Sequence, residues 1–366
     1  MAPDRRRARQ EALVRALETD ALDGLLVTSR ANIRYLTGFS GSAAVVAVTR
    51  ADVLLVTDFR YDEQARAEAG PVARVEVEST SVWDRFFKEL ATLGPLDAMG
   101  YEAHSVSVHD AGRFAEAGKA WRWTPTTELV ERLRAAKDDV EVVAIRNAAL
   151  LAGEAFHQTL GEVRAGMTEL AIAGLLEGAL RRLGSEGHPF PTIVASGPRS
   201  ALPHARSSTR TVAAGEWLLL DFGAQVDGYC ADLTRTVVVG ARATERQRVL
   251  YELVRDAQQR ARTAVRAGMT GRDADALARE PIAARGFGAA FGHSLGHGLG
   301  LEVHEAPRLS KTNTDPLPAG AVVTIEPGVY LAGDGGVRIE DDVHLPAGER
   351  GAELLSDGLT DLLELV

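Results

Sequence analysis

One hexapeptide occurs twice in this sequence, and its two copies lie in similar surroundings. Val163-Arg-Ala-Gly-Met-Thr168 recurs as Val265-Arg-Ala-Gly-Met-Thr270, an offset of 102 residues (265 − 163). Each copy stands between two long amphipathic helix patterns. These four patterns cover residues 139–162, 169–183, 244–264 and 271–284. Six identical residues could arise by chance in a chain rich in Ala and Arg, but the shared order of the flanking helices favours an internal duplication.

Strand-like segments that carry two acids each complete the two halves. Gly215-Glu-Trp-Leu-Leu-Leu-Asp221-Phe-Gly aligns with Gly320-Ala-Val-Val-Thr-Ile-Glu326-Pro-Gly, an offset of 105 (326 − 221), and Asp232 then falls opposite Glu340. Sequence repeats usually indicate solenoids, but two units of this length suit a closed, symmetric domain better. We therefore expect two halves, each with two helices and an acid-bearing strand pair, packed about a pseudo-twofold axis with four carboxylates at the centre.

The first acid-bearing segment has the pattern of a β-hairpin. Asp-Gly is a favoured two-residue hairpin loop, so we expect such a loop at Asp227-Gly228. Asp221 then lies opposite Thr234, and Asp232 becomes its diagonal neighbour on the same face of the hairpin. The two carboxylates are then within reach of a shared ion.

The last acid-bearing strand is expected to alternate its side chains between two faces. Val337 and Ile339 then point into the core, and Arg338 shares the opposite face with Glu340. Three further acids lie at turns or strand ends, where salt bridges or turn caps explain them better than metal binding does: Asp227, Asp341 and Asp342.

The four aligned acids need a chemical explanation, because a buried carboxylate without a partner is very costly. Salt bridges or caps are one explanation. The position of these acids within apolar runs favours a second one, in which two divalent cations balance four negative charges. His297 is the candidate imidazole ligand, because Gly296 and Gly298 let the backbone approach closely. Oxygen-rich ligands with one imidazole suit Mn²⁺, and Co²⁺, Fe²⁺ or Zn²⁺ could replace it.

A pair of such ions indicates hydrolysis. Two ions about 3.5–4 Å apart can share a water, lower its pKa and polarise a carbonyl group. Glu326 is placed to carry a proton from the water to a leaving amine, while His293 and His304 could donate hydrogen bonds to the oxyanion and the substrate carbonyl. A lone histidine is more often a satisfied core residue, but spacings of four and seven in a glycine-rich stretch disfavour that explanation here.

The first third of the chain has the alternation of an α/β domain. We expect helices over 9–19 and 61–69, strands over 24–28, 44–49 and 52–58, and a Gly/Ser-rich turn over 32–42. Asp58, Arg60 and Tyr61 could reach a substrate, but surface or hinge packing explains them better. A proline then breaks the pattern before a helix start, so we expect domains at 1–126 and 127–366.

Length and charge limit the class of protein. A chain of 366 residues suits about two domains, and a net charge of −10 disfavours a nucleic-acid partner. A solvated helix face or a frayed terminus explains the Arg-rich residues 5–9. We expect no membrane span, because no apolar run approaches ~20 residues, and no secretory signal. Cys230 is the single cysteine, which suits a reducing cytoplasm and is better explained as a small buried filler than as a nucleophile.

Together these motifs resemble the pita-bread metallopeptidases, the family of methionine aminopeptidase, aminopeptidase P and prolidase. The matching motifs are Pro191-Thr-Ile-Val-Ala-Ser-Gly197, Asp221-Phe-Gly, Asp232-Leu-Thr-Arg-Thr, His293-Ser-Leu-Gly-His297-Gly-Leu-Gly, Val303-His304-Glu305, Ile325-Glu326-Pro-Gly and Arg338-Ile-Glu340-Asp. The resemblance implies five ligands for two metal ions, namely Asp221, Asp232, His297, Glu326 and Glu340. It places three histidines around the substrate and an arginine beside the ligands, namely His204, His293, His304 and Arg338.

The N-terminal part resembles the creatinase-type α/β domain, in Tyr35-Leu-Thr-Gly-Phe-Ser-Gly-Ser and Thr57-Asp-Phe-Arg-Tyr. Methionine aminopeptidases usually lack this domain, so the resemblance favours the proline-directed branch and implies a homodimer in which the small domain shapes the pocket. Our first hypothesis is an Xaa-Pro aminopeptidase, acting on peptides with proline at the second position. Prolidase, restricted to Xaa-Pro dipeptides, is one alternative. A peptide-binding module without catalysis is another, and the intact ligand set speaks against it.

Overall fold

A computed structural model describes residues 4–348 and 350–366 of the chain, which divides into two compact units after Arg134. The first unit thus extends eight residues beyond the expected domain end (134 − 126). Pro125 lies inside an edge strand of this unit, a position that tolerates proline because its missing N–H is not needed there. The helix after it is held in the same unit, since Arg134 Nη1 donates to Asn32 Oδ1 at 2.7 Å.

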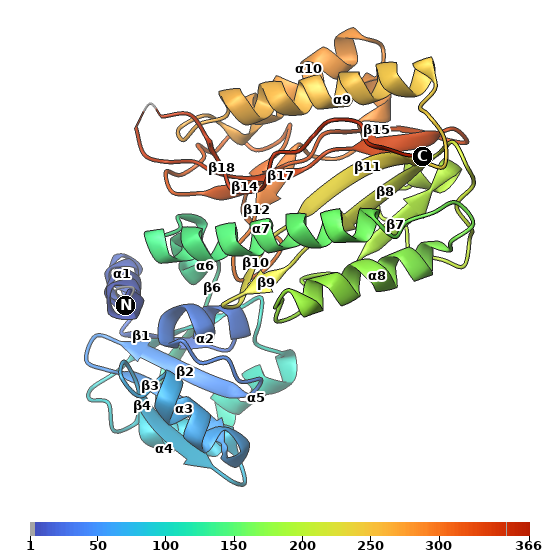
Figure 1. Cartoon of the computed structure of the whole chain (residues 1–366). Helices are drawn as coiled ribbons and strands as arrows, with labels where there is room; N and C mark the ends of the chain where they lie inside the picture. The colour runs from blue at the N-terminus through green and yellow to red at the C-terminus, as the bar shows by residue number, and fades with distance from the viewer. Residues whose placement is uncertain (1–3, 349) are drawn as a thin grey trace. The chain divides into compact units, whose positions relative to one another are not determined.

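Helices and strands alternate along the N-terminal unit, which Figure 1 shows in blue to cyan. Its elements are α1 (Arg6–Thr19), β1 (Gly24–Val27), α2 (Arg30–Thr37), β2 (Ala44–Thr49), β3 (Val53–Asp58), η1 (Phe59–Tyr61), α3 (Asp62–Glu68), β4 (Arg74–Glu78), α4 (Val82–Leu90), β5 (Ala98–Glu102), α5 (Val108–Glu116), β6 (Arg122–Thr126) and α6 (Leu129–Ala135). The predicted helices over 9–19 and 61–69 and the three predicted strands are confirmed.

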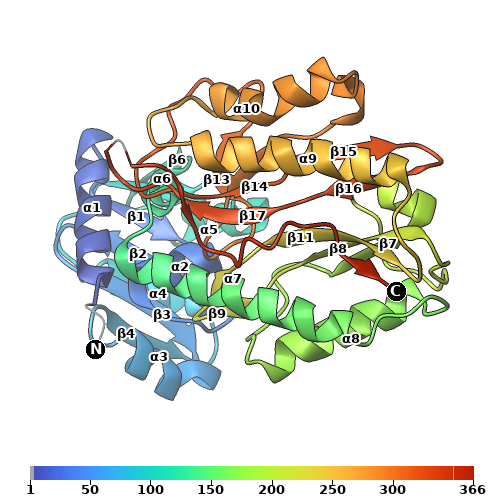
Figure 2. The same cartoon turned by 45° about the horizontal axis from the view of Figure 1, so that its top comes forward.

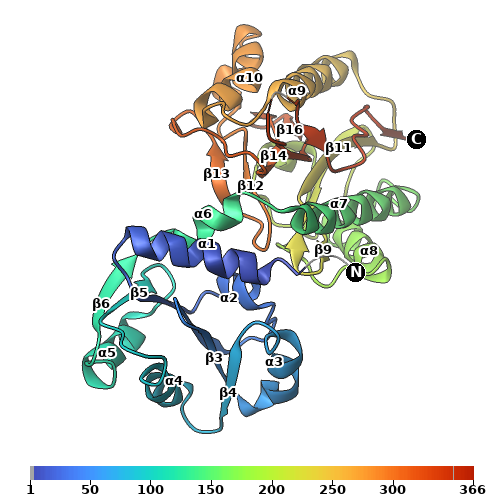
Figure 3. The same ribbon diagram turned by 90° about the vertical axis from the view of Figure 1, so that its left-hand side faces the viewer.

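A six-stranded mixed sheet forms the centre of this unit, in the order β4-β3-β2-β1-β5-β6. Figure 3 shows α1 and α2 on one face of the sheet and α4 and α5 on the other. Consecutive residues such as Leu25 and Leu26 therefore both have 0% exposure, although they point to opposite faces. The exposed Arg60 forms an ion pair with Asp58 at 2.6 Å, which agrees with a surface position for these residues.

Residues 30–37 form helix α2, so the predicted Gly/Ser-rich turn over 32–42 is wrong in its first half. Gly38 ends the helix with a φ of 81°, a left-handed conformation that glycine adopts without strain. At the other end, the amides of Thr28 and Ser29 both donate to Glu102 Oε2 at 2.7 Å. The carboxylate that stabilises the start of this helix is thus more than 70 residues away in sequence, where a local turn pattern cannot reveal it.

The C-terminal unit contains two helix pairs, each followed by strands. The first half holds α7 (Asp139–Leu160), α8 (Glu169–Arg182), β7 (Ile193–Ser196), η2 (Gly197–Ala201), β8 (Glu216–Phe222), β9 (Gln225–Val226), β10 (Tyr229–Cys230) and β11 (Leu233–Val239). The second half holds α9 (Glu245–Ala264), α10 (Gly271–Ala284), η3 (Gly288–Ala290), β12 (Gly296–Gly298), β13 (Glu305–Leu309), β14 (Val322–Ile325), β15 (Gly328–Leu331), β16 (Gly335–Arg338), β17 (Asp341–His344), β18 (Glu353–Leu354) and β19 (Glu364–Leu365).

The strands of this unit lie between the two helix pairs. Figure 1 and Figure 2 both show α7 and α8 on one side of the strands and α9 and α10 on the other. The main sheets have the orders β19-β11-β8-β7 and β13-β12-β14-β17-β18. Each of the two cores contains one stacked aromatic pair. Phe156 of α7 stacks on Phe222 in the first core, and Trp217 stacks on Tyr251 of α9 in the second. In the described ranges, we find no helix with both the length and the apolar character that a membrane span needs.

The two copies of the hexapeptide form the same turn, which confirms the internal duplication. Gly166 N donates to Val212 O at 2.8 Å, and Gly268 N donates to Leu317 O at 2.9 Å. The two acceptors are 105 residues apart (317 − 212), the offset of the aligned acids. The last residue of each copy caps the second helix of its half with its side chain: Thr168 for α8 and Thr270 for α10.

The expected hairpin is also present. Asp227 and Gly228 have φ values of 49° and 77°, as a two-residue loop with two left-handed residues requires. β8 and β11 pair with Asp221 opposite Thr234, as predicted. The hairpin therefore holds Asp221 and Asp232 on one side of the centre of the unit.

Candidate metal centre

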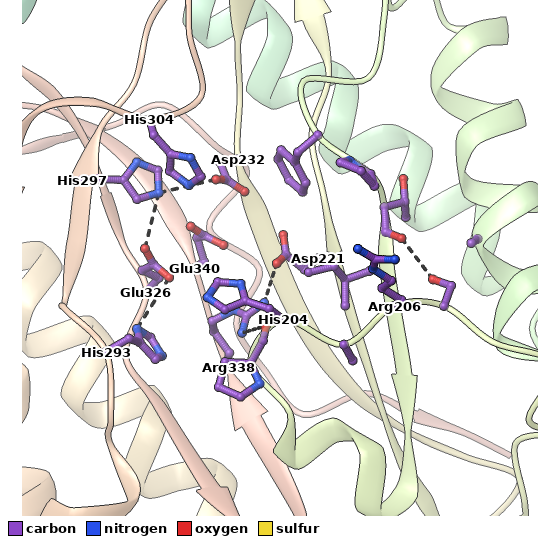
Figure 4. Close-up of a pocket in the computed structure, with 18 of the residues that line it drawn as sticks. His204, Arg206, Asp221, Asp232, His293, His297, His304, Glu326, Arg338 and Glu340 are labelled. Carbon is purple, nitrogen blue, oxygen red and sulfur yellow. Dashed lines mark hydrogen bonds and ion pairs between the residues drawn. The ribbon is translucent and has the colours of Figure 1, made fainter. Parts of the chain in front are cut away.

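The five residues predicted to bind metal meet in one cavity of about 720 Å³. Asp221 lies in β8 and Asp232 directly before β11, whereas His297 lies in β12, Glu326 directly after β14 and Glu340 between β16 and β17. The first half of the unit thus supplies two of these side chains and the second half supplies three. Figure 4 shows the carboxylates directed toward one another between strands of the two halves.

Among the five predicted ligands, the side-chain atoms fall into two overlapping groups, and a third group in the same cavity joins His304 to Asp232 and His297. Oxygens of Asp221, Asp232 and Glu340 lie within 4.8 Å of one another, and so do ligand atoms of His297, Glu326 and Glu340. His297 Nε2 lies 3.7 Å from Asp232 Oδ2 and 3.5 Å from Glu326 Oε1. Glu340 belongs to both groups, so the arrangement offers two adjacent sites that share one carboxylate.

The charges of these groups oppose one another in the metal-free protein. Burial raises the pKa of Asp221. Burial and the neighbouring Glu340 carboxylate raise the pKa of Asp232 and of Glu326 well above their usual values. Burial and Asp221 raise the pKa of Glu340 to about 8. Asp221 Oδ1 is buried and has no hydrogen-bond partner in the described part of the chain. Bound cations would relieve both the repulsion and the unpartnered oxygen, so this donor set fits two divalent ions.

His297 is held as a neutral imidazole at the edge of the carboxylates. Burial and His304 lower its pKa to about 3, and its Nδ1 lies 3.1 Å from Gly298 O, which leaves Nε2 facing the acids. The flanking glycines are required by close backbone contacts, as expected. A Cβ on Gly296 would lie 2.0 Å from Thr324 O, and a Cβ on Gly298 would lie 2.2 Å from Ala306 O.

Arg338 connects the acids to a tyrosine that the sequence analysis did not assign. Its guanidinium donates to Asp221 Oδ2 at 2.5 Å, to Thr234 Oγ1 at 2.9 Å and to the Tyr330 hydroxyl at 2.9 Å. The Tyr330 hydroxyl also shares a hydrogen bond of 2.8 Å with His293 Nε2. Sequence reasoning missed this link because it depends on the pairing of β15 with β16, which brings Tyr330 beside the strand of Arg338.

The three histidines expected near the substrate line the same cavity. The His304 ring lies 4.4 Å from the His297 ring, and His293 Nδ1 lies 3.9 Å from Glu326 Oε2. His204 belongs to the segment that follows η2 (Figure 4). In the described residues, the imidazoles of His204 and His304 have no hydrogen-bond partner, so both are available to a ligand.

The cavity lining also contains apolar and cationic side chains. Leu170, Phe190 and Ile193 form apolar parts of this lining, and Arg206 and Arg308 add positive charge. Sequence reasoning did not select these residues, because nothing in their local pattern distinguishes a pocket wall from an ordinary helix or loop surface. For Arg206, the only sequence feature that pointed to the cavity was its position two residues after His204.

Of the three acids assigned to structural roles, Asp227 lies in the hairpin loop, and the other two have partners within the unit. Asp341 forms an ion pair with Arg235 at 2.8 Å, as expected. Asp342 differs from the expectation of a salt bridge or turn cap: it is buried and accepts the backbone N–H of Asp232 at 3.1 Å, since β17 runs beside the end of the hairpin. Cys230 is buried, and burial raises the pKa of its thiol to about 12, which agrees with a filler role.

Comparison with known proteins agrees with this geometry. Residues 143–347 match metallopeptidase family M24, and residues 9–136 match the creatinase/prolidase N-terminal domain. The chain therefore belongs to the M24 metallopeptidases that carry a creatinase-type N-terminal domain, and the predicted fold class is confirmed.

Relatives of this chain include both kinds of proline-directed peptidase. It is 40% identical to the uncharacterised peptidase YqhT of Bacillus subtilis over 322 residues, which cover 88% of this chain and 90% of the relative. The structure of an Xaa-Pro dipeptidase from Bacillus anthracis matches with a TM-score of 0.94 and 38% identity, over 98% of this chain and 99% of the other. The structure of an X-Pro aminopeptidase from Thermotoga maritima matches with a TM-score of 0.90 and 38% identity, over 97% and 99%.

Proposed function

We propose that this chain is a dinuclear metallopeptidase that hydrolyses the bond between an N-terminal residue and proline. The observation that carries the proposal is the convergence of four carboxylates and one imidazole, from both halves of the C-terminal unit, in a cavity large enough for a peptide. The names of the relatives support proline as the second residue of the substrate.

The proposed metal ligands are Asp221, Asp232, His297, Glu326 and Glu340. Bound ions, with Mn²⁺ the first choice, would acidify a water and polarise the scissile carbonyl. Glu326 would also move the proton in our mechanism. Its carboxylate faces His293 on one side and His297 on the other, so it can accept a proton from the attacking water and donate one to the proline nitrogen that leaves.

The cavity histidines would orient the substrate. His304 and His204 can donate a hydrogen bond to the substrate carbonyl or to the developing oxyanion. Burial lowers the pKa of His293 to about 4, so it is neutral near pH 7. Both of its nitrogens lie within hydrogen-bond distance of protein oxygens, Nδ1 of Ser294 O at 2.8 Å and Nε2 of the Tyr330 hydroxyl. Contact between His293 and substrate would therefore require one of these bonds to exchange.

For the length of the substrate, we propose an aminopeptidase that accepts residues beyond the proline. The second candidate is an Xaa-Pro dipeptidase, which Arg206 and Arg308 favour, because either guanidinium in the cavity wall could bind the free carboxylate of a dipeptide. A panel of Xaa-Pro, Xaa-Pro-amide and Xaa-Pro-Yaa with added Mn²⁺ separates the two. An aminopeptidase cleaves all three, whereas strong cleavage of the dipeptide alone would establish the dipeptidase. Arg206→Ala and Arg308→Ala should then raise KM for the dipeptide more than for its amide.

We further propose a homodimer in a reducing, cytoplasmic setting, with sedimentation equilibrium as the test of the dimer. A metal-loaded protein that binds Xaa-Pro peptides without cleaving any of them would instead favour the non-catalytic binding module.

A further inference from the structure

In the first half of the C-terminal unit, one buried carboxylate holds both ends of the segment that carries His204 and Arg206. Glu169, the first residue of α8, has no exposed surface. Its Oε1 accepts from Ser196 N and Ser196 Oγ, both at 2.9 Å. Its Oε2 accepts from Ser208 N at 3.1 Å and from Ser208 Oγ at 2.6 Å. The Glu169 side chain thus connects two serines that lie twelve residues apart in the sequence (208 − 196).

A salt bridge from the same segment gives Glu169 a third connection to it. Arg199 Nε lies 3.1 Å from Glu169 Oε2, and the Arg199 guanidinium donates to Arg206 O. The main chain at Arg206 is therefore linked to the carboxylate through a single arginine. None of these contacts of Glu169 involves a proposed metal ligand.

The second half has an equivalent device on its own second helix. Asp275 of α10 is 1% exposed and forms a two-bond ion pair with Arg279, at 2.5 and 2.9 Å. Asp275 Oδ1 also accepts from Leu295 N at 3.0 Å, and this N–H is shared with Leu309 O at 2.9 Å. Arg279 donates to Phe291 O at 2.8 Å and to His293 O at 2.6 Å. The segment that carries His293 is thus held at every second residue: Phe291, His293 and Leu295.

We propose that Glu169 and the Asp275–Arg279 pair are positioning residues, each of which fixes the substrate-facing histidine segment of its own half. Residues 197–207 and 291–295 lie outside the strands of the unit, so strand pairing supports these segments only at their ends. Misplacement of a reacting or binding group by about 1 Å can cost about 10²-fold in rate. Each half of the duplicated unit meets this need with an acid on its second helix. The inference rests on the proposed function only in taking the cavity as the substrate site.

The test uses isosteric changes in the full-length protein. Glu169→Gln replaces an acceptor oxygen with a donor that faces Ser208 or Ser196, and Asp275→Asn does the same opposite Leu295 or Arg279. Glu89→Gln is the matched control, because Glu89 is also a buried helix acid in ion pairs with two arginines, but it lies in the N-terminal unit. Hydrogen–deuterium exchange of metal-free protein and steady-state kinetics with Mn²⁺ are measured for each variant.

We expect exchange in residues 197–207 to rise at least about fivefold in Glu169→Gln, and exchange in residues 291–295 to rise similarly in Asp275→Asn, the factor that corresponds to loss of one buried hydrogen bond. Each effect should remain within its own half. KM should rise about tenfold in Glu169→Gln, since His204 and Arg206 line the substrate wall, whereas kcat should fall about 10- to 100-fold in Asp275→Asn. Metal content should stay at the wild-type value in both.

The proposal is overturned if exchange in both segments is unchanged, or if Glu89→Gln changes KM and kcat as much as the two test variants do. If Glu169→Gln does not fold, Ser208→Ala and Ser196→Ala each remove only part of the same contacts, and both must then raise exchange in 197–207. Because exchange is measured without substrate, a wild-type protein that cleaves no Xaa-Pro peptide would refute the proposed function while the exchange result still decides the positioning role.

Discussion

Glu340 lies buried beside Asp221 and accepts a hydrogen bond from Thr234 Oγ1 at 2.6 Å. Because burial and Asp221 raise its pKa to about 8, from a usual value of 4.5, ionised Glu340 destabilises the metal-free fold. The stability that protonated Glu340 contributes relative to the unfolded chain is therefore complete below pH 4.5, and it is lost as the pH rises from there through 8.

We therefore predict that Glu340→Gln flattens the pH dependence of stability. Between pH 5 and 8, the metal-free wild type should lose free energy of unfolding relative to this variant, by at most about 1.4 kcal/mol per pH unit. Urea denaturation in a chelator at several pH values measures the difference. A constant difference across this range would contradict the assigned direction.

Arg338 is the cation that opposes the acids when no metal is bound. Arg338→Met would leave Asp221 buried without its ion pair, and we predict a loss of about 3–5 kcal/mol in the free energy of unfolding of the metal-free protein. Tyr330→Phe is the matched control, because it removes one hydrogen bond to Arg338 and keeps the charge. Denaturation curves of equal midpoint for the two variants would show that Asp221 does not depend on Arg338.

At the scale of elements, β12 passes so close to its neighbours that side chains do not fit beside His297. We predict that Gly296→Ala lowers the free energy of unfolding by about 1–3 kcal/mol through overpacking, and weakens Mn²⁺ binding by displacing His297. Gly292→Ala is the control, because a Cβ there meets nothing within 4 Å, and it should change stability by less than about 0.5 kcal/mol. Calorimetric Mn²⁺ titration of both variants checks the pair.

The elements that could be predicted from sequence are those with a local signal. The hairpin loop at Asp227-Gly228, the duplicated turn and the helix pairs follow from turn chemistry and hydrophobic period, and all are present. Helix α2 could not be found this way, because its N-terminus depends on Glu102, a distant residue. Asp342 shows the same limit at the candidate centre: its partner is the amide of Asp232, 110 residues away.

At the scale of the whole molecule, the proposed ions would join the two halves of the C-terminal unit. Ligand binding to the native state alone stabilises by about 2.7 kcal/mol at a hundredfold excess over Kd. We predict that Mn²⁺ raises the unfolding temperature of the C-terminal unit and leaves that of the N-terminal unit unchanged. Scanning calorimetry with Mn²⁺ and with chelator measures both.

Asp232→Ala provides the control for this experiment. We expect the variant to keep its fold, since Asp232 contacts the ion site more than the core, and to lose both activity and the temperature shift. A shift of equal size in Asp232→Ala would place the stabilising ion elsewhere.

The proposed centre takes Asp221 and Asp232 from one half of the duplicated unit and Glu340 from the end of the other. Neither half alone holds more than three of the five side chains, because His297 and Glu326 also come from the second half. Separation of the two halves would therefore divide the donor set, so we expect tight Mn²⁺ binding to report that the halves are correctly packed together.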